Sequence, residues 1–340
     1  MKKTFSNTYV WRDISDPRRA QTVDDLEAGL KSPDFENLSI PETFGPVKEI
    51  IDDHKIKRYA FALNDYLPWA MQGNSPFDNT RIAQAGLLTN DLLQMFTLGY
   101  RGSQVVGLHT EEQIWFDSPA KLDEIVTLEG TYVDAYEHRG QGCVVLEANA
   151  KGADGRSIIR HRGVEILRTI PGNIVGRGSA APEKRVTGNL PPNPHYIDTI
   201  TSSSKNGDCL TPLSKNITAE QAAVFSRVGE FVTNIHNNLS TARAGGLRMP
   251  IVQGMQSFCT FTELLTRAFG KDFFTGGWIK AKFIAPITVF EDFNVYGMIT
   301  NIEKVSDTQE KVYLDVWIRR QDDRLAVAGW ASCLRNTSDD

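Results

Sequence analysis

The sequence predicts an α+β fold in which one structural unit is used twice, and three observations lead to this prediction. Segments of the first half align with segments of the second half at a nearly constant offset. Each half shows the same order of predicted elements: a short helix, a polar loop, a longer helix and strand-like runs. A long helix followed by long antiparallel strands suits a sheet that wraps around one helix. The chain has 340 residues, 41% of them hydrophobic, which is enough for two domains with cores that need no disulfide bonds.

The internal repeat rests on the steadiness of the offset rather than on sequence identity, because single matches of proline or glycine arise easily by chance. The aligned pairs, whose offsets drift from 166 to 168, are Pro46 with Pro212, Pro119 with Pro286, Gly130 with Gly297, and Arg156 with Arg324. A drift of two residues over a whole half is what a duplicated fold with small loop changes gives.

The repeat and the composition together predict four segments. Residues 1–40 form a polar N-terminal extension with no counterpart in the second half, and "TVDDLEAGL" within it is a candidate surface helix. The first unit spans 41–169. Residues 170–206 are rich in Gly, Pro, Ser and Asn, which favours a linker. The second unit spans 207–340.

Each unit opens with a predicted amphipathic helix, at about 53–63 and 218–232. In the second of these, Thr218 is followed three positions later by Gln221, the spacing of a capping box. The longer helices are expected at about 86–98 and 254–269. The apolar residues that recur at helical spacing in the latter are Met255, Phe258, Phe261, Leu264, Leu265 and Phe269. The strand-like runs after it are "WIKAKFIAPI", "NVYGMITNIEKV" and "KVYLDVWIRR" continued by "LAVAGWASC".

Charge and composition exclude several classes of protein. A net charge of −5 argues against nucleic acid or an anionic membrane as partner, since both require a basic surface. No apolar run approaches the ~20 residues of a membrane span, and the start "MKKTFSNTYVWRD" lacks the apolar core of a signal peptide. We therefore expect a cytoplasmic protein. The four cysteines form no CxxC pair and the six histidines no HxH or HExxH spacing, so neither a metal site nor another cofactor is expected.

The stretch "FVTNIHNNLSTARAGGLRMPIVQGM" carries the most specific pattern in the chain. It resembles the MaoC-like (R)-specific enoyl-thioester hydratase family, in which a loop histidine precedes a small-residue turn and a glycine that opens the central helix. His236 falls on the family histidine and Gly254 on that glycine, with the family's interval of 18 residues between them. The resemblance implies a double hotdog fold. Residues 41–169 become a hotdog repeat with a degenerate site, and 207–340 the repeat that carries the active site.

The sequence departs from the family at one catalytic position. Phe231 stands where the family has its aspartate. Glu230, one residue away, is the candidate replacement; the alternative is a solvated glutamate at a helix end. In the first half Asp65 occupies the aspartate position but Ala70 the histidine position. Because equivalent positions of a duplicated hotdog line opposite pockets, we expect Asp65 to belong, with Gly86, to a pseudo-site away from His236.

The resemblance implies reversible hydration of an enoyl thioester, or dehydration of the 3-hydroxyacyl thioester. His236 would move the proton, and the backbone N–H of Gly254 would donate to the thioester oxygen at the positive end of the helix dipole. The substrate would be an acyl thioester of CoA or of acyl-carrier protein, and a homodimer of the chain stays open. The residues expected to bind substrate or water are Asn234, Asn238, Gln253 and Arg243. Lys280 and Lys282 either meet CoA phosphates or coat the sheet.

Three other functions stay open at this stage. A hotdog acyl thioesterase would use a carboxylate on a central helix, such as Glu263 or Asp91. A non-catalytic hotdog would bind acyl groups or a partner subunit, and a repurposed dehydratase would act on a substrate that is not a thioester. The remaining histidines are expected to be structural or surface residues: His54, His109, His138, His161 and His195.

Overall fold

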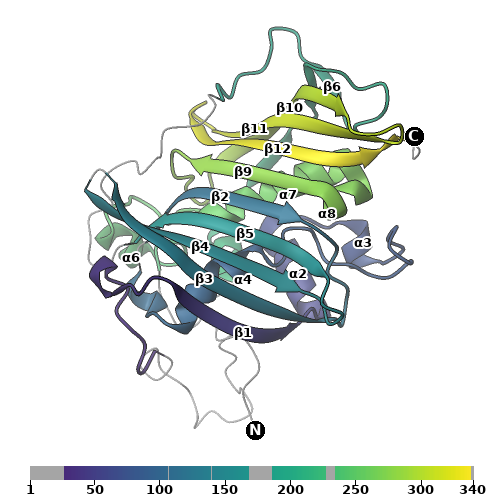
Figure 1. Ribbon diagram of the computed structural model, residues 1–340. Helices are drawn as coiled ribbons and strands as arrows, with labels where there is room; N and C mark the ends of the chain where they lie inside the picture. The colour runs from purple at the N-terminus through teal and green to yellow at the C-terminus, as the bar shows by residue number, and fades with distance from the viewer. Residues whose placement is uncertain (1–26, 106, 139, 168–185, 227–233, 338–340) are drawn as a thin grey trace.

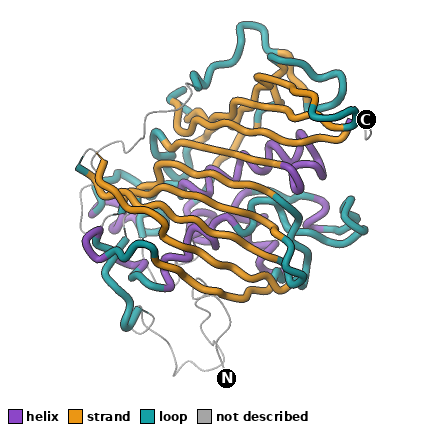
Figure 2. Tube along the Cα trace, viewed as in Figure 1, coloured by secondary structure: helices purple, strands orange, loops and turns teal. Residues whose placement is uncertain are grey.

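In the computed structural model, the described residues are 27–105, 107–138, 140–167, 186–226 and 234–337. In this part of the chain, twelve strands form one continuous sheet, and the helices lie on one side of it (Figures 1 and 2). The predicted α+β layout, with a sheet that wraps around a long central helix, is confirmed.

The elements follow the same order in both halves. The first half contains η2 (Phe35–Asn37), β1 (Glu42–Ile50), α2 (Asp53–Leu63), α3 (Pro68–Met71), α4 (Thr89–Leu93), η3 (Gln94–Leu98), η4 (Gly102–Gln104), β2 (Leu108–Phe116), β3 (Ile125–His138), β4 (Gln141–Lys151) and β5 (Ser157–Ile166). The second half contains β6 (His195–Ile197), β7 (Asp208–Leu210), β8 (Leu213–Asn216), α5 (Ala219–Ser226), α6 (Leu239–Ala244), α7 (Gly254–Phe269), η5 (Gly270–Asp272), α8 (Phe273–Gly276), β9 (Gly277–Phe283), β10 (Asp292–Lys304), β11 (Gln309–Arg320) and β12 (Leu325–Asn336).

The strand order of the second half mirrors that of the first, apart from β7 and β6, which extend the sheet beyond β10. From the first-half edge the order is β1-β3-β4-β5-β2, and then β9-β12-β11-β10 in the second half, where β8 also pairs with β10. The two halves meet where β2 pairs antiparallel with β9, for example Ile114 with Ile279. This mirror order is what two copies of one unit give when a pseudo-twofold axis passes between their central strands. The lower and upper halves of the sheet in Figure 1 are these two copies.

Backbone conformation repeats with the same offset as the sequence. Asp123 and Phe290, which are 167 positions apart, both have a positive φ, of 62° and 65°. Gly130 and Gly297 lie on the equivalent strands β3 and β10, where a Cβ would come within 2.9 Å of Met95 and of Leu210 respectively. The chain therefore needs glycine at both positions for helices or strands to pack closely against the sheet.

Helix α7 is the central helix of the second half and matches the predicted bounds 254–269. It starts after Gln253, whose backbone is extended, and it ends at Gly270, whose φ of 58° few other residues adopt without strain. Nearly all its side chains are buried, because the sheet covers one face and α2 and α4 pack on others. At the start of α5, the predicted capping box forms, since the backbone N–H of Thr218 and that of Gln221 each donate to the other's side chain.

The equivalent helix of the first half differs from the prediction. Instead of one helix over 86–98, α4 covers Thr89–Leu93 and a 3₁₀ segment follows to Leu98. Two polar side chains of this segment bond to the backbone or to a charged partner. Thr89 donates to the Gly86 carbonyl at 2.8 Å, and buried Asp91 accepts from Lys55 at 2.7 Å. The 3₁₀ pattern replaces the α-helical one over Gln94–Leu98.

Some sequence-based expectations fall on other parts of the chain. Most of the candidate surface helix "TVDDLEAGL", and residues 170–185 of the predicted linker, lie outside the described residues. Within the rest of that linker, β6 joins the sheet by pairing in parallel with β7. The exact domain boundaries stay predictions. None of the described helices combines the length and apolar character that crossing a bilayer requires.

Candidate active site

A cavity of about 540 Å³ lies between the two halves of the chain. One wall comes from the second half, where the loop around His236 and the start of α7 meet the turn after β9. The opposite wall comes from β2 and β5 of the first half. The polar and charged side chains that line it are His109, Thr110, Glu165, His236, Gln253, Ser257, Arg320 and Arg324. Apolar residues, including Leu93, Ile251 and Phe283, supply the remaining surface. A cavity of this size and character is suited to a small organic ligand.

The loop that carries His236 is held by its own polar groups and by a neighbouring segment. Asn234 accepts a hydrogen bond from the His236 backbone N–H at 2.8 Å, which tightens the turn. The Ile251 N–H donates to the Ile235 carbonyl at 3.2 Å, and both side chains pack in one small apolar cluster with Leu247. These contacts fix the imidazole at the cavity wall.

The His236 ring is a neutral base in this setting. Its Nδ1 lies 2.8 Å from the carbonyl oxygen of Ile251. Because a carbonyl only accepts, Nδ1 must carry the proton, and Nε2 keeps a lone pair. Burial lowers the pKa of His236 to about 4, against a smaller opposing effect of the hydrogen bond to Ile251. The imidazole is therefore unprotonated at neutral pH.

Gly254 borders the same cavity as His236 and is the first residue of α7. A helix leaves its first N–H groups without partners inside the helix, and no hydrogen bond to the Gly254 N–H is found among the described residues. A Cβ at this position would lie 3.0 Å from both Cβ and Nδ1 of His109. Glycine therefore permits a close approach that any other residue would block.

Gln253 lines the cavity immediately before α7. Its side-chain N–H donates to the Asn90 side chain of the first half at 2.9 Å, and Asn90 in turn donates to the Phe225 carbonyl at 2.9 Å. The Gln253 Oε1 is buried and has no partner within the described part of the chain. An unpaired buried acceptor of this kind is uncommon in folded proteins.

The first-half wall contains a histidine that sequence reasoning assigned to a structural or surface role. His109 lines the cavity, and its Nε2 lies 2.6 Å from a carboxylate oxygen of Glu112. The other oxygen of Glu112 lies 2.8 Å from Nε2 of His161. Glu165 also lines the cavity, directly opposite His109 across the β2–β5 pair. Burial raises the pKa of Glu165, while the charge of His109 lowers it in part.

The other predicted residues lie outside this wall. The Asn234 and Asn238 side chains are engaged within the loop, where Asn238 caps α6 by accepting from the Thr241 N–H at 2.9 Å. Arg243 is exposed on α6, and neither it nor the two asparagines line the cavity. Glu230 lies outside the described residues.

Asp65 and Glu263 meet at a separate cavity of about 280 Å³, away from His236. Burial raises the pKa of Asp65 to about 7, and the charge of Glu263 adds to the effect. Glu263, one of the two carboxylates named for thioesterase chemistry, pairs with Arg267 at 2.7 Å and with Lys215. Gly86, the other pseudo-site residue, is buried and would meet Tyr59 if it carried a Cβ.

The first-half counterpart of the large cavity is nearly filled. Phe116 and Pro119 line a space of about 10 Å³, as Phe283 and Pro286 line the large cavity 167 positions later. The side chain of Phe274 is buried at this place. The rings that pack against Phe274 are Trp69 and Phe77. The two copies of the unit thus differ in the space they leave for a ligand.

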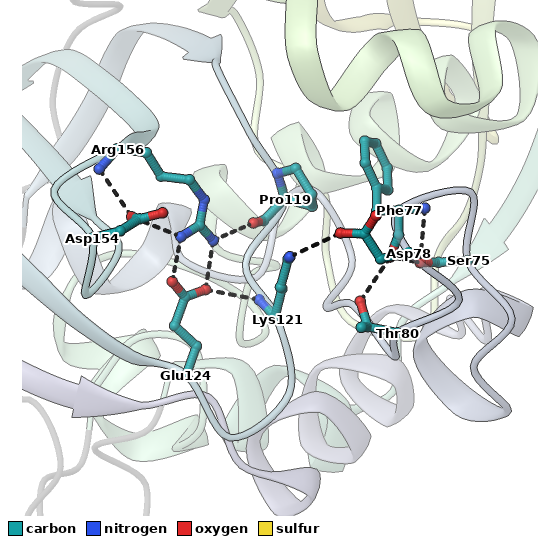
Figure 3. A network of polar contacts seen from close by, with 9 residues as sticks. All are labelled: Ser75, Phe77, Asp78, Thr80, Pro119, Lys121, Glu124, Asp154 and Arg156. Atoms are coloured by element: carbon teal, nitrogen blue, oxygen red, sulfur yellow. Dashed lines mark hydrogen bonds and ion pairs between the residues drawn. The ribbon is translucent and has the colours of Figure 1, made fainter.

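An arginine at equivalent positions explains part of this difference. Arg156 donates to the Pro119 carbonyl at 2.9 Å and to both carboxylate oxygens of Glu124 at 2.6 and 2.7 Å, which ties the turn shut (Figure 3). Its second-half counterpart, Arg324, pairs only with Asp322 at 2.7 Å among the described contacts, and its side chain is 70% exposed. Arg324 also lines the large cavity, so an exposed positive charge lies at its solvent side.

The lysines after the central helix do not reach this side of the cavity. Lys280 and Lys282 are buried, and both pair with Glu111, at 3.3 and 3.4 Å. A role for them in meeting CoA phosphates is therefore wrong, because their charges are already matched inside the sheet. Among the described side chains, no three His, Cys, Asp or Glu residues gather as a group that could hold a metal ion.

No protein-family model matches the chain, and no curated protein matches it in sequence. Solved structures do match its fold. A MaoC-like dehydratase is 14% identical over 89% of this chain and 99% of that chain, with a TM-score of 0.67. A putative MaoC domain protein dehydratase from Chloroflexus aurantiacus is 11% identical over 89% and 97%, with a TM-score of 0.65. A conserved hypothetical protein from Mycobacterium tuberculosis with a double hotdog fold is 15% identical over 89% and 98%, with a TM-score of 0.62.

These likenesses cover almost the whole length of both chains in each comparison. They confirm that the protein is a double hotdog protein of the α+β class, and that it resembles the MaoC-like dehydratases in fold. At such low identity they establish the architecture, and the chemistry has to be argued from the cavity itself.

Proposed function

We propose that the protein catalyses the reversible hydration of a 2-enoyl thioester to a 3-hydroxyacyl thioester. The observation that carries the proposal is that His236 and the N-terminal residue of α7, Gly254, border one cavity of about 540 Å³. The MaoC-like dehydratases that share the fold support the same class of reaction.

Each half of the reaction has a group suited to it. Hydration requires a base that takes a proton as water attacks C3, and the neutral His236, whose Nε2 keeps a lone pair, has the protonation state for that step. Attack places negative charge on the thioester oxygen. The Gly254 N–H, at the positive end of the α7 dipole, stabilises that charge.

The mouth of the cavity suits an acyl carrier. Arg320 and Arg324 line it; Arg320 is already paired with Glu291 at 2.7 Å, whereas the side chain of Arg324 is mostly exposed. Both CoA and acyl-carrier protein present phosphate groups on the pantetheine arm, and arginine pairs well with phosphate. The acyl group would enter past these side chains and reach His236 from outside. A homodimer stays an open alternative, and the cytoplasmic location expected from the sequence stays a prediction.

The position of Glu263 disfavours thioester hydrolysis. Its carboxylate pairs with two cations at a separate cavity, so it cannot serve as the base or nucleophile at the His236 cavity. No described observation favours a non-thioester substrate.

The test is a side-by-side assay of the purified protein with saturated acyl-CoA and with 2-enoyl-CoA of several chain lengths. We expect loss of the enoyl absorbance without release of free thiol. His236→Ala should lower kcat by about 100-fold or more, the usual effect of losing a general acid or base. Release of thiol from acyl-CoA, or full activity of His236→Ala, would overturn the proposal.

A further inference from the structure

We propose that His109 of the first half is the second acid/base residue of the cavity, held in place by the buried carboxylate of Glu112. This inference rests on the proposed function and adds the group that delivers the proton to C2. It also gives the first half of the duplicated chain a direct part in the reaction.

His109 lies where the reacting end of a substrate would lie. It belongs to the cavity lining, and its Nδ1 would be 3.0 Å from a Cβ on Gly254. The ring therefore sits beside the N–H that is proposed to bind the thioester oxygen, next to which C2 must lie. His109 and His236 come from different halves of the chain and line the same space.

The orientation of the His109 ring is fixed. Its Nε2 lies 2.6 Å from Glu112 Oε2, and its plane stacks on Phe283 with centroids 4.6 Å apart and an angle of 21°. Because a carboxylate only accepts, Nε2 carries a proton, and Nδ1 is the atom left for the cavity. No hydrogen bond to Nδ1 is found among the described residues.

Glu112 is unusual because it is a fully buried carboxylate between two histidines. Its side chain is 0% exposed, and so is that of His161, whose Nε2 lies 2.8 Å from Glu112 Oε1. Gly163 makes room for this arrangement, since a Cβ there would lie 3.0 Å from Glu112 Oε2 and 3.1 Å from the His161 ring. A buried charge is retained at a cost unless it is paired, and here both its partners are imidazoles.

The two cavity histidines are pushed toward opposite protonation states. Desolvation lowers the pKa of His109, but the hydrogen bond and the charge of Glu112, with a smaller effect of Glu165, outweigh it and raise the pKa above its ordinary value. The charged and titratable groups that face His109 are Glu112, His161 and Glu165, and the N-terminus of α7 contributes a partial positive charge. Pairs of groups whose environments separate their pKa values are typical of acid/base assignments in active sites.

The proton and electron changes balance in the hydration direction. The water oxygen forms a bond to C3 while His236 Nε2 takes one water proton, and the C2=C3 π electrons move onto the thioester as an enolate. The enolate re-forms the carbonyl as C2 takes a proton from His109 Nδ1. His236 ends protonated and His109 neutral. Exchange of one proton with solvent at each ring then restores the starting state.

The experiment compares His109→Gln and Glu112→Gln with the wild-type protein, and uses His195→Gln as the matched control. His195 is a mostly exposed histidine that pairs with Asp208 far from the cavity wall. We expect His109→Gln to lower kcat about 100-fold or more with little change in KM, and His195→Gln to keep wild-type kcat. Glu112→Gln should move the alkaline limb of the kcat profile to lower pH, because it removes the charge that favours protonated His109.

The outcomes separate the inference from the proposed function. If wild-type protein turns over 2-enoyl-CoA, His236→Ala abolishes turnover and His109→Gln retains it, the function stands and the role of His109 is overturned. If His109→Gln is inactive but the Glu112→Gln profile is unchanged, the loss reflects packing and the role is again overturned. If wild-type protein hydrates no 2-enoyl thioester, the proposed function and the role of His109 are both overturned. A ¹⁵N spectrum of labelled histidines checks the protonation state of His109 directly. The inference requires that the His109 nitrogens titrate at lower pH in Glu112→Gln than in wild type.

Discussion

The buried imidazole of His236 makes the protein less stable in acid, and replacing it with Gln should remove part of that loss. The pKa of His236 falls from its ordinary 6.5 to about 4 on folding, mainly through burial. Between these values the unfolded chain binds more protons than the folded protein, so stability falls as pH falls. At about 1.36 kcal/mol per pKa unit, the wild type should lose about 3 kcal/mol by pH ~4 that a neutral glutamine does not lose.

The assay is urea unfolding of the wild type, His236→Gln and the control His195→Gln at about pH 7 and about pH 4, with the free energy of unfolding extrapolated to water. Acid affects other groups, such as Glu112, equally in all three proteins, so the difference between wild type and variant isolates His236. We expect His236→Gln to lose about 3 kcal/mol less than either of the other two. Equal acid sensitivity of wild type and His236→Gln would show that the ring is solvated, and the assignment of a buried neutral base would be wrong.

Three further substitutions, with Arg160→Ala as a control, test other parts of the site and core. Gly254→Ala places a Cβ 3.0 Å from the His109 ring, so kcat should fall about tenfold or more while the loss of stability stays within about 1–3 kcal/mol. Unchanged kinetics would mean that the reaction does not need the close packing of residue 254 against His109. Arg324→Ala should raise KM for CoA thioesters about threefold at low salt and leave kcat unchanged, and the effect should fade as salt rises. Arg160→Ala, an exposed arginine of the first half, should change neither constant. Lys55→Met leaves two buried carboxylates without their cation and should cost about 3–5 kcal/mol in urea unfolding; a loss below about 1 kcal/mol would contradict a stabilising pair.

Much of the architecture could be predicted because it depends on local pattern and repetition. Apolar spacing and Gly270 set the ends of α7, and the steady offset between halves matches the mirror order of the strands. The 86–98 helix could not be predicted correctly, since its outcome depends on tertiary partners such as Lys55, which the local sequence does not reveal. Tertiary contacts override propensity where polar side chains are buried.

Only the residues of the candidate site that lie in one continuous stretch of sequence could be predicted. His236 and Gly254 lie in that stretch. His109 and Glu112 do not, and they lie three positions apart on a strand, where side chains normally alternate and would face opposite sides. The register of β2 against β5 shifts between His109 and Glu111, and this bulge brings the two side chains to the same side. A bulge leaves almost no trace in sequence; the only signal was a histidine close to an acidic pair in a strand-like run.

The most direct measurement is a crystal structure of His236→Gln protein with a 2-enoyl-CoA bound, since this variant should hold the substrate without turning it over. The account predicts that the thioester oxygen lies about 2.7–3.1 Å from the Gly254 nitrogen, with C3 facing residue 236 and the pantetheine arm leaving past Arg324. An acyl group bound elsewhere, or a carbonyl turned away from the start of α7, would contradict it.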